Sequence, residues 1–316
     1  MKVLLRERDL SDDYILFAQQ IGADGFDIHS PANIPGFVEQ GYPDLEQLVK
    51  LKEKVNAAGL GIYRVAPPDP QRFLLGEAGG EQEVEHLGKT IEIFGQAGIP
   101  FMSTPVHLGI NPGYRGGYAK THRGGYTMHG FEVERMKKSL TENPPAPFSV
   151  ETHWERCVQM YQRLVPVAEK CDVKLIIHPS DPPLPETEFS PRRWEGILNA
   201  VPSTHSGLLY CIGTRCESGV DIVEDIRYFG GKGKIFHTHF RNVQGTIPKS
   251  GGYAEVALDD GDMNMFKVLQ TLTEVGFDGG LQIDHLPNYA GDTPNQKIAS
   301  AYAVGYIKAL LKALEA

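Results

Sequence analysis

The chain has 316 residues, of which 41% are hydrophobic and 22% charged, so it is long and apolar enough to bury the core of a large α/β domain. Its formal net charge of -9 excludes a global attraction to nucleic acid or to anionic membranes, and any anionic substrate must be bound by local arginines. No apolar run approaches the roughly 18 residues of a membrane span, and four cysteines are too few for a disulfide framework, so we expect a cytoplasmic protein.

Eight short apolar runs follow one another along the chain, each with the length of a buried β-strand. In chain order they cover residues 2–7, 25–30, 60–66, 100–108, 173–179, 207–213, 234–242 and 280–286. Between them lie amphipathic runs with helical spacing, several ending in Gly, at residues 44–60, 83–99, 153–171 and 262–277. Because strands and helices alternate and the strands are continuously apolar, the pattern predicts a parallel sheet covered by helices.

The number of βα units favours a closed barrel over an open sheet. Eight units in about 250 to 320 residues match the length of a (β/α)8 barrel. A doubly wound sheet usually has fewer strands and often a Gly-rich dinucleotide loop, and no GxGxxG motif follows the first strand here. We therefore predict a single (β/α)8 TIM barrel domain over residues 1–316, with a long inserted loop at about 107–148.

Four residues with metal-binding side chains stand near the ends of four consecutive predicted strands: His178, Cys211, His239 and Asp284. They are 33, 28 and 45 residues apart, against about 31 residues for one βα unit of such a barrel. The third gap is longer because it includes a polar, Gly-containing stretch at 244–262, which we expect to be a loop. Each residue alone could be structural, but together at one rim they predict a metal site at the carboxyl end of the barrel.

Three neighbours of these residues are candidates for catalysis. His237 lies two residues before His239 on the same strand face, so it could orient a ligand or be a core histidine. His285 has the opposite parity to Asp284 and could face the helices, unless the strand tip twists it over the site. Arg241 is expected to pair with a substrate carboxylate, or else to form a salt bridge with an acidic loop.

Several motifs in the second half resemble those of the mannonate dehydratase family. They are the segments HPSDPP at 178–183, CIGTRCESGVDI at 211–222, KIFHTHFRNV at 234–243, LDDGDMNMFKVL at 258–269 and QIDHLP at 282–287. The resemblance covers roughly residues 170 to 290 and implies a xylose-isomerase-like barrel that uses a divalent metal to eliminate water from a sugar acid. It also implies His178, Cys211, His239 and Asp284 as the metal ligands, Arg241 and His285 as neighbours of the substrate, and manganese as the usual ion.

The chain departs from the family pattern at Ser180, at Ala257 and at Ile283, and its first half fits less well. The metal site therefore transfers better than the substrate pocket. The identity of the metal is also open on chemical grounds. A thiolate ligand favours zinc, iron or cobalt, whereas a carboxylate and an oxygen-rich substrate suit manganese.

The inserted segment at 107–148 is rich in aromatic residues, arginines and glycines, among them His107, Tyr114, Arg115, Tyr118, His122, Arg123, Tyr126 and His129. Connections of this length are usually binding loops or lids. We expect it either to close over a polyhydroxy substrate or to pack against another subunit of a homo-oligomer.

Three hypotheses about function follow. The first is a metal-dependent dehydratase (a hydro-lyase) that converts a sugar acid such as D-mannonate into a 2-keto-3-deoxy acid, with His285, Arg241 and His237 as candidate catalytic residues. The second is a sugar isomerase or epimerase of the same barrel type. The third is a sugar-binding protein without activity, which rarely needs a metal with open coordination positions. In each case the partner is a small sugar or sugar acid.

Overall fold

The computed structural model describes the chain except for residues 105, 107–114, 145–148, 180, 184–190 and 316. Its centre is a closed barrel of parallel strands in the order β1-β12-β9-β8-β7-β4-β3-β2. The strands are β1 (Lys2–Arg6), β2 (Gly25–Ile28), β3 (Gly61–Val65), β4 (Phe101–Ser103), β7 (Lys174–Ile177), β8 (Ser206–Cys211), β9 (Ile235–His239) and β12 (Gly280–Ile283). Each overlaps one of the eight runs that we predicted as strands, and only β8 begins a residue earlier than predicted, so the (β/α)8 barrel is confirmed.

Strand register places the predicted ligands at one rim. Cys211, the last residue of β8, pairs with His239, the last residue of β9. His239 in turn pairs with Gln282 of β12, two residues before Asp284. Because neighbouring parallel strands end at the same edge, the side chains that follow them converge at the carboxyl mouth of the barrel.

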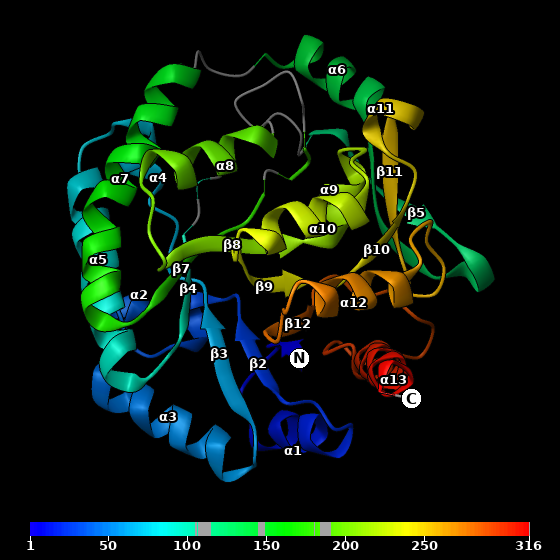
Figure 1. The fold of residues 1–316 in the computed structure, drawn as a ribbon, viewed down its shortest axis with the longest axis horizontal. Helices are drawn as coiled ribbons and strands as arrows, with labels where there is room; N and C mark the ends of the chain where they lie inside the picture. Colours follow the sequence, from blue (N-terminus) through cyan, green and yellow to red (C-terminus); the bar gives the residue numbers. More distant parts are fainter. Residues whose placement is uncertain (105, 107–114, 145–148, 180, 184–190, 316) are drawn as a thin grey trace.

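Helices surround the barrel, as Figure 1 shows. The four predicted helical runs correspond to α3 (Leu45–Ala57), α5 (Gly80–Ala97), α7 (Val150–Cys171) and α12 (Met265–Glu274). The others are α1 (Asp12–Gln20), α2 (Phe37–Gln40), α4 (Gln71–Leu75), α6 (Val133–Glu142), α8 (Pro191–Ala200), α9 (Ile212–Glu217), α10 (Ile222–Gly231), α11 (Ile247–Ser250) and α13 (Lys297–Leu314). Among the described residues, no helix is both long and apolar enough to cross a membrane.

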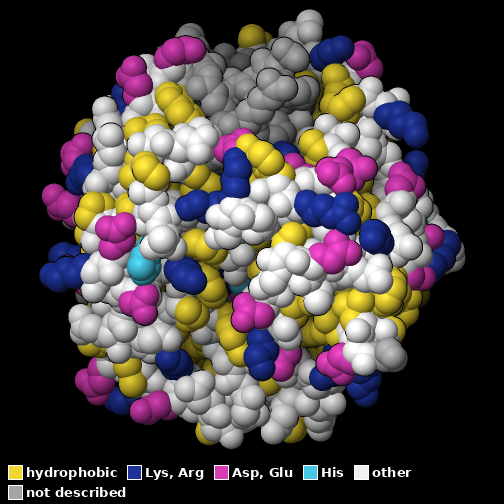
Figure 2. Space-filling model, in the orientation of Figure 1, with side chains coloured by type: hydrophobic (Ala, Val, Ile, Leu, Met, Phe, Trp, Pro, Cys, Tyr) yellow, Lys and Arg dark blue, Asp and Glu magenta, His cyan; other side chains and the backbone are white. Residues whose placement is uncertain are grey.

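The helices begin and pack as their sequences predict. In α3, the Asp44 carboxylate caps the first turn by accepting a hydrogen bond from the Gln47 amide at 2.9 Å, while Leu48 and Val55 are buried against the barrel. The main hydrophobic core lies between the helices and the strands. On the face drawn in Figure 2, acidic and basic side chains are interspersed and neither sign forms a large patch.

A second, antiparallel sheet in the order β10-β11-β6-β5 stands beside the barrel (Figure 1). It joins β5 (Gly117–Thr121) and β6 (Thr127–Glu132) to β10 (Asn242–Gln244) and β11 (Gly252–Val256). The segments that we predicted as loops at 107–148 and 244–262 therefore contain strands and short helices, and residues 107–114 and 145–148 lie outside the described residues. The described parts of the two insertions pair with each other through β6 and β11 and bury a small cluster of Phe131, Ile247 and Tyr253.

Candidate metal centre

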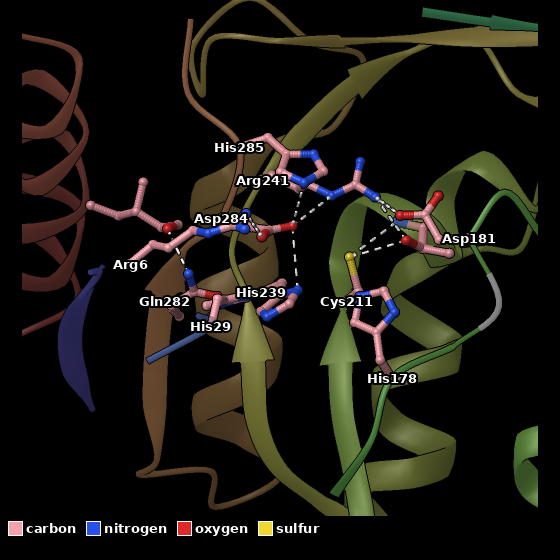
Figure 3. A network of polar contacts seen from close by, with 12 residues as sticks. Arg6, His29, His178, Asp181, Cys211, His239, Arg241, Gln282, Asp284 and His285 are labelled. Carbon is pink, nitrogen blue, oxygen red and sulfur yellow. Dashed lines mark hydrogen bonds and ion pairs between the residues drawn. The ribbon is translucent and has the colours of Figure 1, made fainter. Parts of the chain in front are cut away.

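Three of the four predicted ligands form a compact group at the barrel mouth. One ligand atom each of His178, Cys211 and His239 lies within 4.8 Å of the other two. Asp284 joins them through His239, whose Nδ1 lies 3.3 Å from the Asp284 Oδ2 (Figure 3). As the strand-end positions predicted, side chains that are up to 106 residues apart in the chain lie at the same rim of the barrel.

The structure adds a histidine that the sequence reasoning missed. His29 directly follows β2 and forms a second candidate group with His239 and Asp284, again with the ligand atoms within 4.8 Å of one another. The run GFDIHS at 25–30 carries the same signal as the predicted ligands, a histidine at the tip of an apolar strand. Applying that criterion to the first half of the chain would have identified His29.

The protonation states of the histidines suit a cation. Burial lowers the pKa of His178 to about 3 and that of His239 to about 4, so both rings are neutral at ordinary pH and keep a lone pair for a metal. The Nε2 of His239 is buried and has no hydrogen-bond partner among the described residues. Such an unpaired buried nitrogen is costly unless something binds it, and a metal ion between these side chains would do so.

Cys211 and Asp284 complete a donor set that fits a divalent transition metal. Burial raises the pKa of the Cys211 thiol to about 12, so a bound cation is needed to hold the thiolate at neutral pH. Although burial opposes it, His239 and His285 hold the pKa of Asp284 well below its ordinary value. The residues present therefore fit a metal with nitrogen, sulfur and oxygen ligands.

The structure revises the expectation for Arg241. Its side chain is 1% exposed and contacts carboxylates of this chain: an oxygen of Glu217, an oxygen of Glu255 at 3.3 Å and Asp284 Oδ2 at 3.4 Å. One of its nitrogens also donates to Thr214 Oγ1 at 2.7 Å. Arg241 therefore forms the buried salt bridges of our alternative interpretation, and its guanidinium already faces carboxylates of this chain. Burial raises the pKa of Glu217 to about 8 even though Arg241 opposes this shift.

His285 lies over the site, as the alternative interpretation of its strand-tip position predicted. Its Nδ1 is 2.7 Å from Glu255 Oε1, and its Nε2 is 3.7 Å from Asp284 Oδ2. Burial lowers its pKa, but Asp284 and Glu255 outweigh burial and raise it to about 9. Because Glu255 belongs to β11, the second sheet supplies the carboxylate that orients this histidine.

His237 lies below the site rather than in it. Its side chain is 0% exposed, and its Nε2 is 2.6 Å from Asp27 Oδ2. The same carboxylate oxygen accepts a hydrogen bond from Arg64 Nε at 3.1 Å, and another Arg64 nitrogen contacts His29. His237 thus belongs to a buried chain that supports His29 from beneath, so we revise its expected role as a catalytic residue to one of support.

A cavity of about 280 Å³ opens above these residues. The first half of the barrel lines it with Arg6, His29, Arg64, Ser103 and Thr104. The second half lines it with Ile176, His178, Asp181, Leu209, His239, Asp284 and His285. Its volume is close to the lower end of ordinary ligand sites, which suits a small sugar acid.

Comparison with protein families gives the site a context. The family model described as D-mannonate dehydratase (UxuA) matches residues 118–316, more than half of the chain and all four predicted ligands. The chain belongs to the D-mannonate dehydratase family. The prediction of a hydro-lyase related to mannonate dehydratases is therefore confirmed.

Individual relatives agree with this membership. The mannonate dehydratase of Thermotoga maritima is 29% identical over 279 residues, which cover 76% of this chain and 77% of the relative. The crystal structure of mannonate dehydratase from Streptococcus suis superposes with a TM-score of 0.81 at 25% identity, covering 99% of this chain and 93% of that one. A xylose isomerase domain protein from Planctomyces limnophilus, at 15% identity and a TM-score of 0.65, shares the fold alone.

The family match begins at residue 118 and so includes β6, β11 and the strands that carry the predicted ligands. It leaves out β1 to β4, which carry the pocket residues Arg6, His29 and Arg64. Family membership therefore bears more directly on the half of the site that carries the candidate ligands than on the half that faces it.

Proposed function

We propose that this protein is a metal-dependent dehydratase that removes water from D-mannonate to give a 2-keto-3-deoxy acid. The observation that carries the proposal is the group formed by His178, Cys211 and His239 at the barrel mouth, two of whose members, His178 and His239, line the cavity together with His285. Membership in the D-mannonate dehydratase family supports the substrate class.

The reaction removes the proton from C2 of the sugar acid and expels the hydroxyl group of C3. The electron pair of the C2–H bond forms a C2–C3 double bond, the hydroxyl accepts a proton and leaves as water, and the resulting enol converts to the 2-keto-3-deoxy acid. A divalent ion held by His178, Cys211, His239 and Asp284 would supply the positive charge that stabilises negative charge on the substrate carboxylate as the C2 proton leaves.

We propose Mn²⁺ as the ion. The carboxylate of Asp284 and the oxygen-rich substrate support this choice, whereas the sulfur of Cys211 would also accept Fe²⁺, Co²⁺ or Zn²⁺. Thr214 Oγ1 lies 3.1 Å from the Cys211 sulfur, close enough to donate a hydrogen bond that fixes its direction.

His285 is the side chain we assign to proton transfer at the departing hydroxyl. Glu255 accepts a hydrogen bond from its Nδ1 at 2.7 Å, which leaves Nε2 on the side of Asp284 and the cavity. A histidine held by a carboxylate on one nitrogen and open to the substrate on the other has the geometry of a general acid. The ring is part of the cavity wall, so a bound sugar acid meets it directly.

The test is a panel of aldonates, each incubated with the Mn²⁺-loaded protein and followed by mass spectrometry. The proposal predicts that D-mannonate yields a product lighter by one water. A product of unchanged mass but altered stereochemistry would instead indicate an epimerase or isomerase. If no aldonate in the panel loses water while the protein holds its metal, the proposal is wrong.

A further inference from the structure

An aldonate carries a full negative charge at neutral pH, and this chain has a net charge of -9, so a local cation must receive that charge. Arginine suits this role because its planar guanidinium can bind a carboxylate through two hydrogen bonds. Three arginines approach the candidate site: Arg6 from β1, Arg64 from β3, and Arg241 from the turn that follows β9. Their existing contacts decide which of them is free to bind a substrate.

Two of the three arginines are already engaged. Arg64 is 2% exposed and divides its guanidinium between Asp27 Oδ2 at 3.1 Å, Ser103 Oγ at 2.5 Å and the ring of His29. Arg241 is equally buried among carboxylates, as described above, and is not part of the cavity wall. If either arginine turned toward a substrate, a buried carboxylate would lose its partner. An unpaired buried charge is costly, so neither arginine is free to bind the substrate.

Arg6 differs from both in exposure and in its contacts. It is the last residue of β1, its side chain is 32% exposed, and it lines the cavity. Its only ion pair with a described residue joins its NH1 to Asp284 Oδ1 at 3.8 Å, which is longer than a hydrogen bond. No described residue accepts a hydrogen bond from its guanidinium, so these N–H groups are available to a ligand.

The position of Arg6 relative to the candidate metal ligands also fits a substrate. Leu5 pairs with Ile283, so the side chains that follow, Arg6 and Asp284, stand level with each other on adjacent strands. In the view of Figure 3, Arg6 reaches Asp284 from the side opposite His178 and Cys211. A carboxylate held near the ligand group on that side would meet the guanidinium.

We propose that Arg6 is the receptor for the substrate carboxylate and that it selects sugar acids over neutral sugars. This inference rests on the proposed function, since it assigns the anionic group of the same substrate. A different role for Arg6, in which it only orients the ligand Asp284, makes a different prediction: its replacement would then release the metal rather than weaken the binding of the acid.

The experiment compares Arg6→Gln and Arg6→Lys with the wild type, all loaded with Mn²⁺. Metal content is measured by elemental analysis, KM and kcat are measured with D-mannonate, and calorimetry gives the affinities for D-mannonate and for neutral D-mannose. Lys2→Gln is the matched control, because it removes one positive charge from the other end of the same strand, where Lys2 is largely exposed.

In Arg6→Gln we expect the KM and Kd for D-mannonate to rise about 10- to 100-fold, the usual range for losing a charged hydrogen-bond partner. The metal content and the affinity for D-mannose should stay at the wild-type values. Arg6→Lys should recover part of the affinity because it restores the charge, and Lys2→Gln should leave every value unchanged.

Two results would overturn the proposal: an Arg6→Gln protein that binds D-mannonate as tightly as the wild type, or one whose weaker binding follows from loss of metal. A wild-type protein that binds aldonates but dehydrates none of them would refute the proposed function, and the binding measurements would still test Arg6. A wild-type protein that binds no aldonate would refute both.

Discussion

The two halves of the barrel contribute different chemistry to one cavity. The second half, from β7 to β12, supplies His178, Cys211, His239 and Asp284, which are metal-binding side chains at strand ends. The first half, from β1 to β4, supplies mainly hydrogen-bond donors and cationic groups. The family match covers the second half and not the first. One wall of the cavity thus carries the candidate metal ligands, and the facing wall carries most of the hydrogen-bond donors and arginines that could meet a substrate.

The largest effect should come from His239→Ala in the metal-binding half, because His239 belongs to both candidate ligand groups. We expect most of the metal to be lost and kcat/KM to fall by at least about 1,000-fold, or about 4 kcal/mol. Elemental analysis and steady-state kinetics measure the two effects. His129→Ala is the control, since His129 is an exposed histidine on β6. Full metal content in His239→Ala would contradict the assignment of this half.

In the first half of the barrel, Arg64→Met should mainly lower the stability of the folded protein. This change leaves the buried Asp27 carboxylate without the guanidinium that pairs with it and with only His237 beside it, and we expect the free energy of unfolding to fall by about 3 kcal/mol. Denaturant titration measures the loss. Adding Asp27→Asn should restore part of the stability because it removes the uncompensated charge, while Arg227→Met on the exposed surface should leave the midpoint unchanged. An Arg64→Met protein as stable as the wild type would refute this account.

A smaller effect is expected from Glu255→Ala, which removes the carboxylate that orients His285. We predict that kcat falls about 100-fold while KM and metal content stay nearly constant, because the change acts on proton transfer and not on binding. The kcat of Glu255→Gln should lie between those of the wild type and Glu255→Ala, since the amide oxygen of Gln can still accept the hydrogen bond. Glu132→Ala, an exposed change on the neighbouring strand β6, is the control. A wild-type kcat in Glu255→Ala would exclude the positioning role.

The smallest effect is expected from His29→Gln in the first half. Arg64 always carries its protons, so it donates to His29 Nε2 and fixes the ring proton on Nδ1, where it can serve a substrate hydroxyl. We expect KM to rise about 10-fold with unchanged metal content, the loss of one hydrogen bond of ordinary strength. His86→Gln on α5 is the control. Loss of the metal in His29→Gln would show instead that the second ligand group holds the ion.

The sequence predicted the barrel, and the position of the candidate ligands at one rim, because the signals for both are local. Each barrel strand is an apolar run a few residues long, and Cys211 and His239 stand at the ends of two such runs. A barrel of successive βα units then fixes which strands are neighbours, so spacing alone brings the ligands together. Nothing about distant partners was needed for these predictions.

The second sheet and the partners of Arg241 depended on distant residues. The sheet was not predicted, and for Arg241 the sequence left two interpretations open, a substrate carboxylate or a salt bridge within the chain. The sheet pairs Tyr253 with Phe131, residues that lie more than a hundred positions apart between two weakly alternating segments. Arg241 could be assigned to the substrate only while Glu217 and Glu255 were unplaced, because these carboxylates come from α9 and β11. The sequence shows that charges are present, but the fold decides which of them meet.

We propose that the rim of the second half holds a divalent metal, and the metal content of Cys211→Ser is the direct test of this site. Cys216→Ser is the matched control, because Cys216 is also a buried cysteine and lies five residues after Cys211, on the short helix α9 that follows β8. After loading with Mn²⁺ and gel filtration, we predict equimolar metal in the wild type and in Cys216→Ser, and clearly less in Cys211→Ser. Equal metal in all three proteins would contradict the account.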